Sequence, residues 1–291
     1  MSNPVIDRIT TLVLPEADPR TLQAAQACLG MEPSRILSEG RAIEGHTEFS
    51  DSHAAMGALD AANLRADVAV TEVANRRKSL LICDMDSTLI GQECIDELAD
   101  FAGVKDRVSE ITERAMQGEI GFDGALKERV GLLKGLPLSN LQDCFDARIT
   151  INLGAKTLRA TMAKHGATTM IVSGGFTFFS RRVAESCGFE AHQANVLLDD
   201  GFALLGTVAE PILGRDAKLQ AMLAAIASPE NAVAIGDGAN DLAMIEAAGL
   251  GIAYYAKPAV AAAAGCAIRF TDLRTALFYQ GYSDSDFIEV G

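Results

Sequence analysis

The chain has 291 residues, of which 49% are apolar, and its formal net charge is −14. This apolar share excludes a disordered chain, and the acidic balance argues against nucleic acids and anionic membranes as partners. No apolar run approaches the roughly 20 residues of a membrane span, and residues 1–7 do not have the form of a signal peptide. The six cysteines show no paired or metal-binding spacing, so we expect reduced thiols and a cytoplasmic protein.

The first predicted unit covers residues 1–75. Its pattern predicts four strands and two helices in the order β-α-β-β-α-β, at residues 10–14, 21–29, 35–37, 42–49, 52–64 and 67–73. Ser52 is the predicted N-cap of the second helix. The order is typical of a ferredoxin-like fold and resembles the regulatory ACT-type amino-acid-binding domains. We expect a module for packing or homodimerisation, and binding of serine or another effector stays open. Polar, basic residues 75–79 form the predicted linker.

The second predicted unit, residues 80–291, begins with the apolar run 80–83, which is typical of a buried parallel strand. Asp84 and Asp86 follow directly, at the edge where open α/β sheets bind their ligands. Ionised carboxylates are too costly to bury unpaired, so the pair predicts a hard divalent cation, Mg²⁺. One carboxylate can attack phosphorus, and the other can move protons. The alternative is a turn in which both residues cap a helix.

The segment 84–88, Asp-Met-Asp-Ser-Thr, resembles motif I of the haloacid dehalogenase (HAD) superfamily. Together with Glu93 it is similar to the phosphoserine phosphatases in particular. The resemblance covers about residues 80–280. It implies that Asp84 is the nucleophile, that Asp86 is the general acid and base, and that Mg²⁺ is the cofactor.

Short helices punctuated by Gly and Pro fill residues 92–153 and predict a small helical cap inserted after the first strand. A cap of this kind excludes water during transfer and reopens to release product. By resemblance, Glu93 binds the substrate ammonium group, Arg129 binds the carboxylate and Phe122 helps to close the pocket. The alternative is that both charged residues lie on solvated helix surfaces.

A second apolar strand, residues 168–172, ends at Ser173, Gly174 and Gly175, and a helix follows. A hydroxyl and free backbone N–H groups at a helix start can bind phosphoryl oxygens, although a tight turn also needs glycine. The segment resembles motif II. Lys218, on the predicted helix 214–225, has the place of the motif III lysine, which implies both catalytic and substrate-binding roles; its rivals in sequence are Lys156, Lys164 and Arg215.

The third strand, residues 231–235, ends in Gly-Asp-Gly-Ala-Asn-Asp and resembles motif IV. Asp237 offers a hard oxygen ligand, and the resemblance implies that Asn240 contacts the substrate. Asn240 and Asp241 are predicted to start the next helix. Asp200–Gly201, between two apolar runs, predicts a hairpin. The acidic tail 283–291 is expected to be mobile.

Together these patterns predict an α/β fold: a HAD-like, doubly wound parallel sheet with a small helical cap, and an N-terminal α+β ferredoxin-like domain. The resemblance implies hydrolysis of O-phospho-L-serine, the last step of serine biosynthesis, through an aspartyl-phosphate. It also implies a Mg²⁺ site at Asp84, Asp86 and Asp237. The alternatives are a phosphatase or phosphotransferase for another small phosphomonoester, and a metabolite-binding regulator with an inactive catalytic domain.

Overall fold

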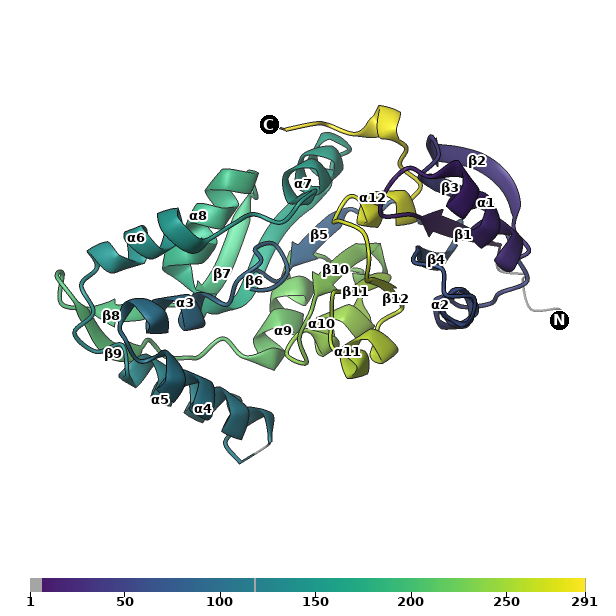
Figure 1. Ribbon diagram of the computed structural model, residues 1–291. Helices are drawn as coiled ribbons and strands as arrows, with labels where there is room; N and C mark the ends of the chain where they lie inside the picture. The colour runs from purple at the N-terminus through teal and green to yellow at the C-terminus, as the bar shows by residue number, and fades with distance from the viewer. Residues whose placement is uncertain (1–6, 118, 291) are drawn as a thin grey trace, which may run out of the picture.

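The computed structural model describes residues 7–117 and 119–290 and contains the two expected sheets (Figure 1). The N-terminal sheet is antiparallel with strand order β2-β3-β1-β4. Its elements are β1 (Arg8–Val13), α1 (Pro19–Cys28), β2 (Glu32–Ser38), β3 (Ala42–His46), α2 (Ser52–Ala61) and β4 (Asp67–Glu72). This is the predicted β-α-β-β-α-β order.

The prediction that Ser52 caps α2 was wrong, because Asp51 takes that position. Asp51 has an extended backbone, and its side chain accepts a hydrogen bond of 2.9 Å from the Ala54 N–H. The Ser52 hydroxyl instead accepts a 3.0 Å bond from the Val70 N–H on β4. A contact distant in sequence therefore fixes which of two adjacent capping residues is used.

The second sheet has six parallel strands in the order β12-β11-β10-β5-β6-β7. The strands are β5 (Leu80–Cys83), β6 (Thr168–Phe176), β7 (Ala191–Asn195), β10 (Ala232–Gly236), β11 (Leu250–Tyr254) and β12 (Cys266–Ile268). The helices are α7 (Ala155–Lys164), α8 (Thr177–Cys187), α9 (Arg215–Ala225), α10 (Leu242–Ala247), α11 (Pro258–Ala263) and α12 (Thr275–Tyr279), with short 3₁₀ turns at Pro229–Asn231 and Asp284–Asp286.

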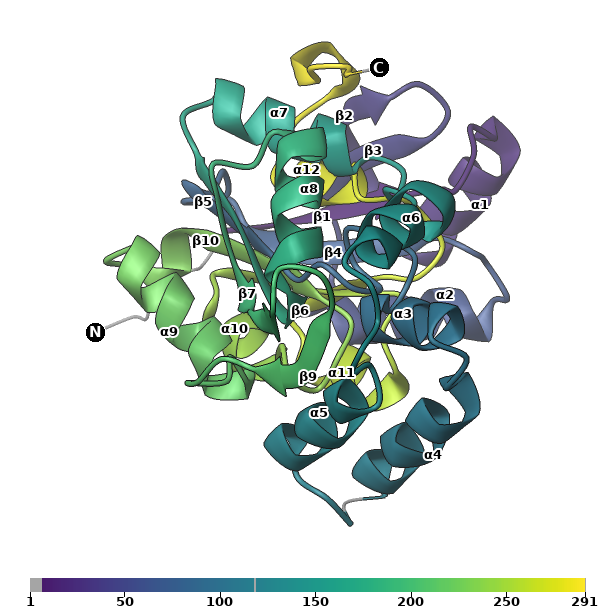
Figure 2. The ribbon, with the colours of Figure 1, turned by 90° about the vertical axis from the view of Figure 1, so that its left-hand side faces the viewer.

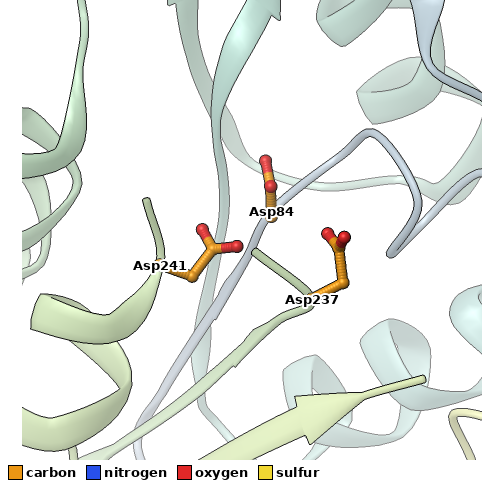
Figure 3. Close-up of side chains that lie close together, drawn as sticks. All are labelled: Asp84, Asp237 and Asp241. Carbon is orange, nitrogen blue, oxygen red and sulfur yellow. The ribbon is translucent and has the colours of Figure 1, made fainter. Parts of the chain in front are cut away.

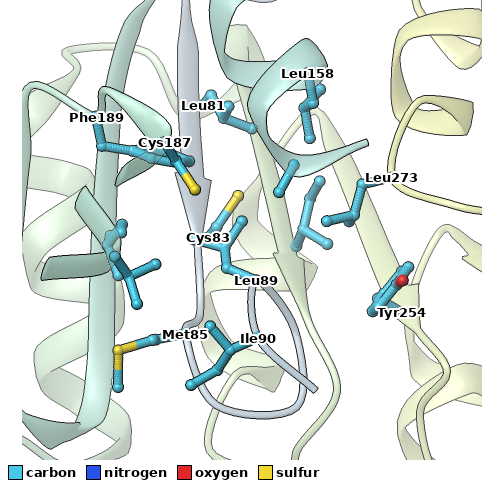
Figure 4. Close-up of a cluster of buried hydrophobic side chains, with 14 of the residues drawn as sticks. Leu81, Cys83, Met85, Leu89, Ile90, Leu158, Cys187, Phe189, Tyr254 and Leu273 are labelled. Atoms are coloured by element: carbon cyan, nitrogen blue, oxygen red, sulfur yellow. The ribbon is translucent and has the colours of Figure 1, made fainter. Parts of the chain in front are cut away.

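Strand β5 lies between β10 and β6, and Leu80 pairs with Ala232 on one side and Thr168 on the other. Its apolar side chains are completely enclosed, and Figure 4 shows Leu81 and Cys83 in a cluster of buried side chains that includes Leu158 of α7. Because all six strands are parallel, the residues that follow β5, β6 and β10 meet at one edge of the sheet.

The cap consists of α3 (Cys94–Phe101), α4 (Lys105–Met116), α5 (Phe122–Gly131) and α6 (Ser139–Arg148). Figure 2 shows α4 and α5 side by side at the outer end of the cap. The predicted hairpin forms as β8 (Leu197–Asp199) and β9 (Leu204–Val208), and it is hydrogen-bonded to the cap: the Gly135 N–H donates to the Leu204 carbonyl at 2.8 Å. The cap is therefore joined to a hairpin contributed by a later part of the chain.

The predicted linker 75–79 is firmly held. Arg76 donates to the Tyr279 carbonyl at 3.0 Å and to the Thr11 hydroxyl at 2.6 Å, and it forms an ion pair with Glu44. These bonds join the N-terminal sheet to α12, which lies beside β1 in Figure 1. The two predicted domains thus share an extensive, partly ionic contact.

The expectation of a mobile tail was wrong for residues 283–288. Ser283 and Asp286 form a capping box, and the Phe287 ring lies 5.1 Å from that of Phe278. The Ile288 N–H donates to the Thr161 hydroxyl at 2.9 Å. This segment is held by contacts that its acidic composition does not indicate. Residue 291 lies outside the described residues. No helix in the described part of the chain could cross a membrane.

Candidate active site

The loop after β5 is a tight turn around the Met85 carbonyl, which accepts hydrogen bonds from the Leu89 and Ile90 N–H groups at 2.9 and 3.0 Å. Within it, Ser87 has a left-handed backbone with φ of 54°, a conformation that costs energy for a residue other than glycine. The turn presents Asp84 at the sheet edge, with 4% of its surface exposed.

Lys218 of α9 lies completely buried against two carboxylates. Its Nζ is 2.8 Å from Asp84 Oδ2 and 2.6 Å from Asp241 Oδ1. Burial alone would lower the pKa of Lys218, but attraction and hydrogen bonds from Asp84 and Asp241 reverse this effect and raise its pKa. The lysine is therefore a permanent cation beside the Asp84 carboxylate.

Three carboxylates converge at this edge of the sheet: the oxygens of Asp84, Asp237 and Asp241 lie within 4.8 Å of one another (Figure 3). The Thr88 hydroxyl donates to Asp237 Oδ1 at 3.2 Å. Burial and the charge of Asp84 raise the pKa of Asp237 to about 6 and that of Asp241 to about 7, although Lys218 opposes both shifts. One ammonium group cannot neutralise three crowded carboxylates, so the site favours an added cation.

The donor set fits a hard divalent ion, which prefers carboxylate oxygens. Asp241 belongs to this cluster, although its place in the sequence predicts only the start of a helix. The sequence feature that could have revealed this membership is a second carboxylate four residues after Asp237, at the N-cap position of α10. Its Oδ2 accepts a 3.0 Å bond from the Gly238 N–H, which fixes the side chain toward Lys218.

The Asp86 carboxyl lies outside this cluster among the described residues, so it is not a side-chain ligand in this arrangement. It accepts a 3.2 Å bond from the Cys94 N–H at the start of α3. Burial, followed by repulsion from Glu93, raises the pKa of Asp86 well above its ordinary value. A carboxyl that keeps its proton near neutral pH can act as a general acid.

The Ser-Gly-Gly segment lies against Asp86, but β6 continues through it to Phe176 and does not end at Val172. Ser173 is completely buried, and its Oγ accepts a 2.9 Å bond from the Gly175 N–H. A Cβ on Gly175 would lie 2.4 Å from Asp86 Oδ2, so the backbone approaches that carboxyl as closely as glycine allows.

Two more predicted residues lie beside Gly174. A Cβ on Gly174 would lie 3.3 Å from Cζ of Phe122 and 3.9 Å from Nδ2 of Asn240. Phe122, at the start of α5, is 37% exposed and comes from the cap, whereas Asn240 comes from the loop after β10. The structure thus brings together segments that lie more than 100 residues apart.

Glu93 and Arg129 lie on the cap side of the site. The Ser87 hydroxyl donates to Glu93 Oε1 at 2.7 Å. Desolvation by the surrounding protein raises the pKa of Glu93 to about 7, although part of the residue is exposed to solvent. Arg129 is half-buried on α5, and its Nη1 donates to the Thr112 hydroxyl at 3.4 Å. Burial lowers the pKa of Arg129, while Asp96 and Glu93 oppose this shift.

Comparison with known proteins agrees with this geometry. The family model for haloacid dehalogenase-like hydrolases matches residues 78–249. A phosphoserine phosphatase of Archaeoglobus fulgidus is 48% identical over 188 residues, covering 63% of this chain and 54% of that protein. One of a Polaromonas species is 42% identical over 190 residues, covering 62% and 80%. The chain thus spans just over half of the first relative.

Solved structures give the same result. An unliganded probable phosphoserine phosphatase from Vibrio cholerae has a TM-score of 0.79 and 31% identity, covering 97% of this chain and 88% of its own. A substrate-bound phosphoserine phosphatase complex has a TM-score of 0.65 and 37% identity, covering 69% and 98%. The first similarity includes the N-terminal unit, and the second is confined to about two thirds of the chain. On its sequence, fold and site, the chain belongs to the haloacid dehalogenase-like hydrolases and, within them, to the phosphoserine phosphatase family.

Proposed function

We propose that this protein hydrolyses O-phospho-L-serine to L-serine and phosphate. The observation that carries the proposal is the buried cluster of Asp84, Lys218 and two further carboxylates, covered by a cap that carries Glu93 and Arg129. The cluster suits phosphoryl transfer, and the opposite charges on the cap suit the two ends of an amino acid.

In the proposed reaction, an Asp84 oxygen attacks phosphorus and the seryl oxygen leaves with the proton from Asp86. Asp86 then takes a proton from water, which attacks the aspartyl-phosphate and releases inorganic phosphate. The Ser173 hydroxyl, the Gly174 N–H and Lys218 hold the phosphoryl oxygens and compensate their negative charge.

Mg²⁺ would be held by the carboxylates of Asp84 and Asp237 and by the Asp86 backbone carbonyl. Asp241, which belongs to the same cluster, accepts a hydrogen bond from Lys218. When bound, the ion supplies positive charge beside the phosphoryl oxygens and keeps the crowded carboxylates ionised. The Thr88 hydroxyl orients Asp237, and the short bond from Lys218 fixes Asp84.

On the cap, Arg129 would bind the substrate carboxylate and Glu93 its ammonium group. Thr112 holds the Arg129 guanidinium, and Ser87 holds Glu93. The Phe122 ring, beside Gly174, would shield the reacting phosphoryl group from water, and Asn240 lies beside the same glycine.

The test is phosphate release from L-phosphoserine and from phosphoethanolamine, which lacks the carboxylate, each with Mg²⁺ and with chelator. We expect metal-dependent turnover with a strong preference for phosphoserine. Asp84→Asn should reduce turnover by more than about 10³-fold, because the amide is a poor nucleophile. Equal rates on the two compounds would retain the phosphatase chemistry with another small phosphomonoester, and no release would favour a binding protein.

Homodimerisation through residues 1–75 stays a prediction. Light scattering of the full chain at several concentrations would test it, because a dimer has twice the mass of the monomer. A constant monomer mass would leave the N-terminal unit as a packing module.

A further inference from the structure

The cap is tied to the catalytic loop through its return connection, residues 150–154. The Asn152 N–H donates to the Leu89 carbonyl at 2.9 Å, and its side chain donates to the Thr88 carbonyl at 2.8 Å. Thr88 in turn donates to Asp237. The outgoing connection is bound to the same segment, since the Gly91 N–H donates to the Thr150 carbonyl at 3.2 Å. A shift of the return connection would therefore move the cap, whereas Asp84 is held independently by Lys218 and by the Met85 N–H.

On its other side, the return connection contacts residues 269–274, the loop between β12 and α12. The Leu273 N–H donates to the Leu153 carbonyl at 3.2 Å. Gly154 has a φ of 85°, and a Cβ there would lie 2.7 Å from the Arg274 nitrogen and 2.8 Å from Asp272 Oδ1. The two segments are in such close contact that only glycine fits, so the position of the loop determines that of the return connection.

The N-terminal unit holds this loop with two carboxylate contacts. Asp67, completely buried at the start of β4, accepts bonds from the N–H groups of residues 269, 270 and 271 at 2.8, 3.1 and 2.9 Å, and from the Thr271 hydroxyl at 2.7 Å. Arg41, just before β3, donates to Asp272 Oδ2 at 2.9 Å and to the Leu14 carbonyl at 3.2 Å. Buried charges are retained where their partners are fixed, so these contacts define one loop position.

We propose that the N-terminal unit positions the cap hinge, and that Arg41 and Asp67 are the positioning residues. They hold the 269–274 loop against the return connection, which sets how the cap presents Glu93 and Arg129 to the substrate. Hinges are a few residues far from the chemistry whose placement changes turnover. The effect on substrate choice rests on the proposed function, whereas the effect on the hinge does not.

The variant Arg41→Ala tests this proposal because it removes the ion pair and keeps all four Asp67 bonds. In the full chain with Mg²⁺, kcat/KM for phosphoserine should fall about ten-fold, since misplacement by 1 Å costs up to about 10²-fold. The value for p-nitrophenyl phosphate, which has no amino-acid head for the cap to bind, should fall less than about two-fold. Arg41→Lys should restore part of the loss.

Arg35→Ala is the matched control. Arg35 also joins the N-terminal sheet to the catalytic part, through a 2.6 Å bond to the Gly281 carbonyl, and it forms an ion pair with Glu44 within its own sheet. These two bonds do not reach the 269–274 loop, so the ratio of the two substrates should stay at the wild-type value. Equal losses on both substrates in Arg41→Ala, or the same change of ratio in Arg35→Ala, would overturn the proposal.

Hydrogen exchange of the substrate-free proteins gives a readout that is independent of the reaction. The Asn152 and Leu273 amides should exchange several-fold faster in Arg41→Ala than in the wild type or Arg35→Ala, and unchanged exchange would refute the hinge role. If wild-type protein shows no preference for phosphoserine over phosphoethanolamine, the proposed function fails, while the exchange result still decides the hinge proposal.

Discussion

Replacing Gly175 by alanine should damage catalysis much more than folding. The new Cβ would lie 2.4 Å from Asp86 Oδ2, whereas ordinary contacts begin at 3.4 Å, so the carboxyl or the strand must retreat by about 1 Å. A displacement of 1 Å costs on the order of 10²-fold in rate when it affects a catalytic group. Gly175 does not have positive φ, so alanine adds no left-handed backbone strain there.

The assay is kcat for phosphoserine at saturating Mg²⁺, together with urea denaturation of the same samples. Gly124→Ala is the control, because nothing lies within 4 Å of a Cβ at this position in α5 and alanine favours a helix by up to about 1 kcal/mol. We expect about 10²-fold loss in Gly175→Ala and wild-type turnover in Gly124→Ala. Wild-type turnover in Gly175→Ala would refute the role given to the position of the Asp86 carboxyl.

Three further changes have defined outcomes. Lys218→Met should destabilise the chelated protein by about 3–5 kcal/mol in urea denaturation, because Asp84 and Asp241 lose their buried cation; an unchanged midpoint would contradict this. Burial raises the pKa of Asp272, but the bonds from Arg274 outweigh this effect and lower the pKa overall. Ionised Asp272 therefore stabilises the folded protein at neutral pH, and this contribution is lost as the pH falls through the folded-state pKa. Asp272→Asn should therefore cost about 2 kcal/mol at pH 7, with the difference from wild type shrinking as the pH falls through the folded-state pKa of Asp272, and a pH-independent difference would argue against the linkage. Arg129→Lys should raise KM for phosphoserine about ten-fold and leave phosphoethanolamine unaffected; equal changes would remove Arg129 as the carboxylate reader.

Much of the fold followed from local patterns. Each of the apolar runs before Asp84, Ser173 and Asp237 forms a buried parallel strand, and parallel strands place the residues that follow them at one edge. The roles of Glu93 and Arg129 toward the two ends of a substrate followed only from the resemblance to the phosphoserine phosphatases. The two residues belong to separate helices, and hydrophobic periodicity does not reveal which face of each cap helix turns toward the sheet.

What the sequence did not reveal depends on partners distant along the chain. Asp241 has the form of an ordinary helix-capping residue, and its membership of the carboxylate cluster depends on Lys218, which is 23 residues away. Arg76 lies in a basic segment typical of a solvated linker, yet its side chain binds Thr11 and Glu44 of the N-terminal sheet. Short polar segments carry no local signal for such burial, because their patterns are the same whether water or a carboxylate is the partner.

The contact between Asp67 and Thr271 has a consequence for how the chain is made. The two residues are 204 positions apart, and ribosomes add about 5–20 residues per second, so roughly 10–40 s separate their synthesis. During that interval the face of the N-terminal sheet that will meet α12 has no partner. This face of the N-terminal unit therefore stays exposed until residue 271 and the helix that follows it have left the ribosome.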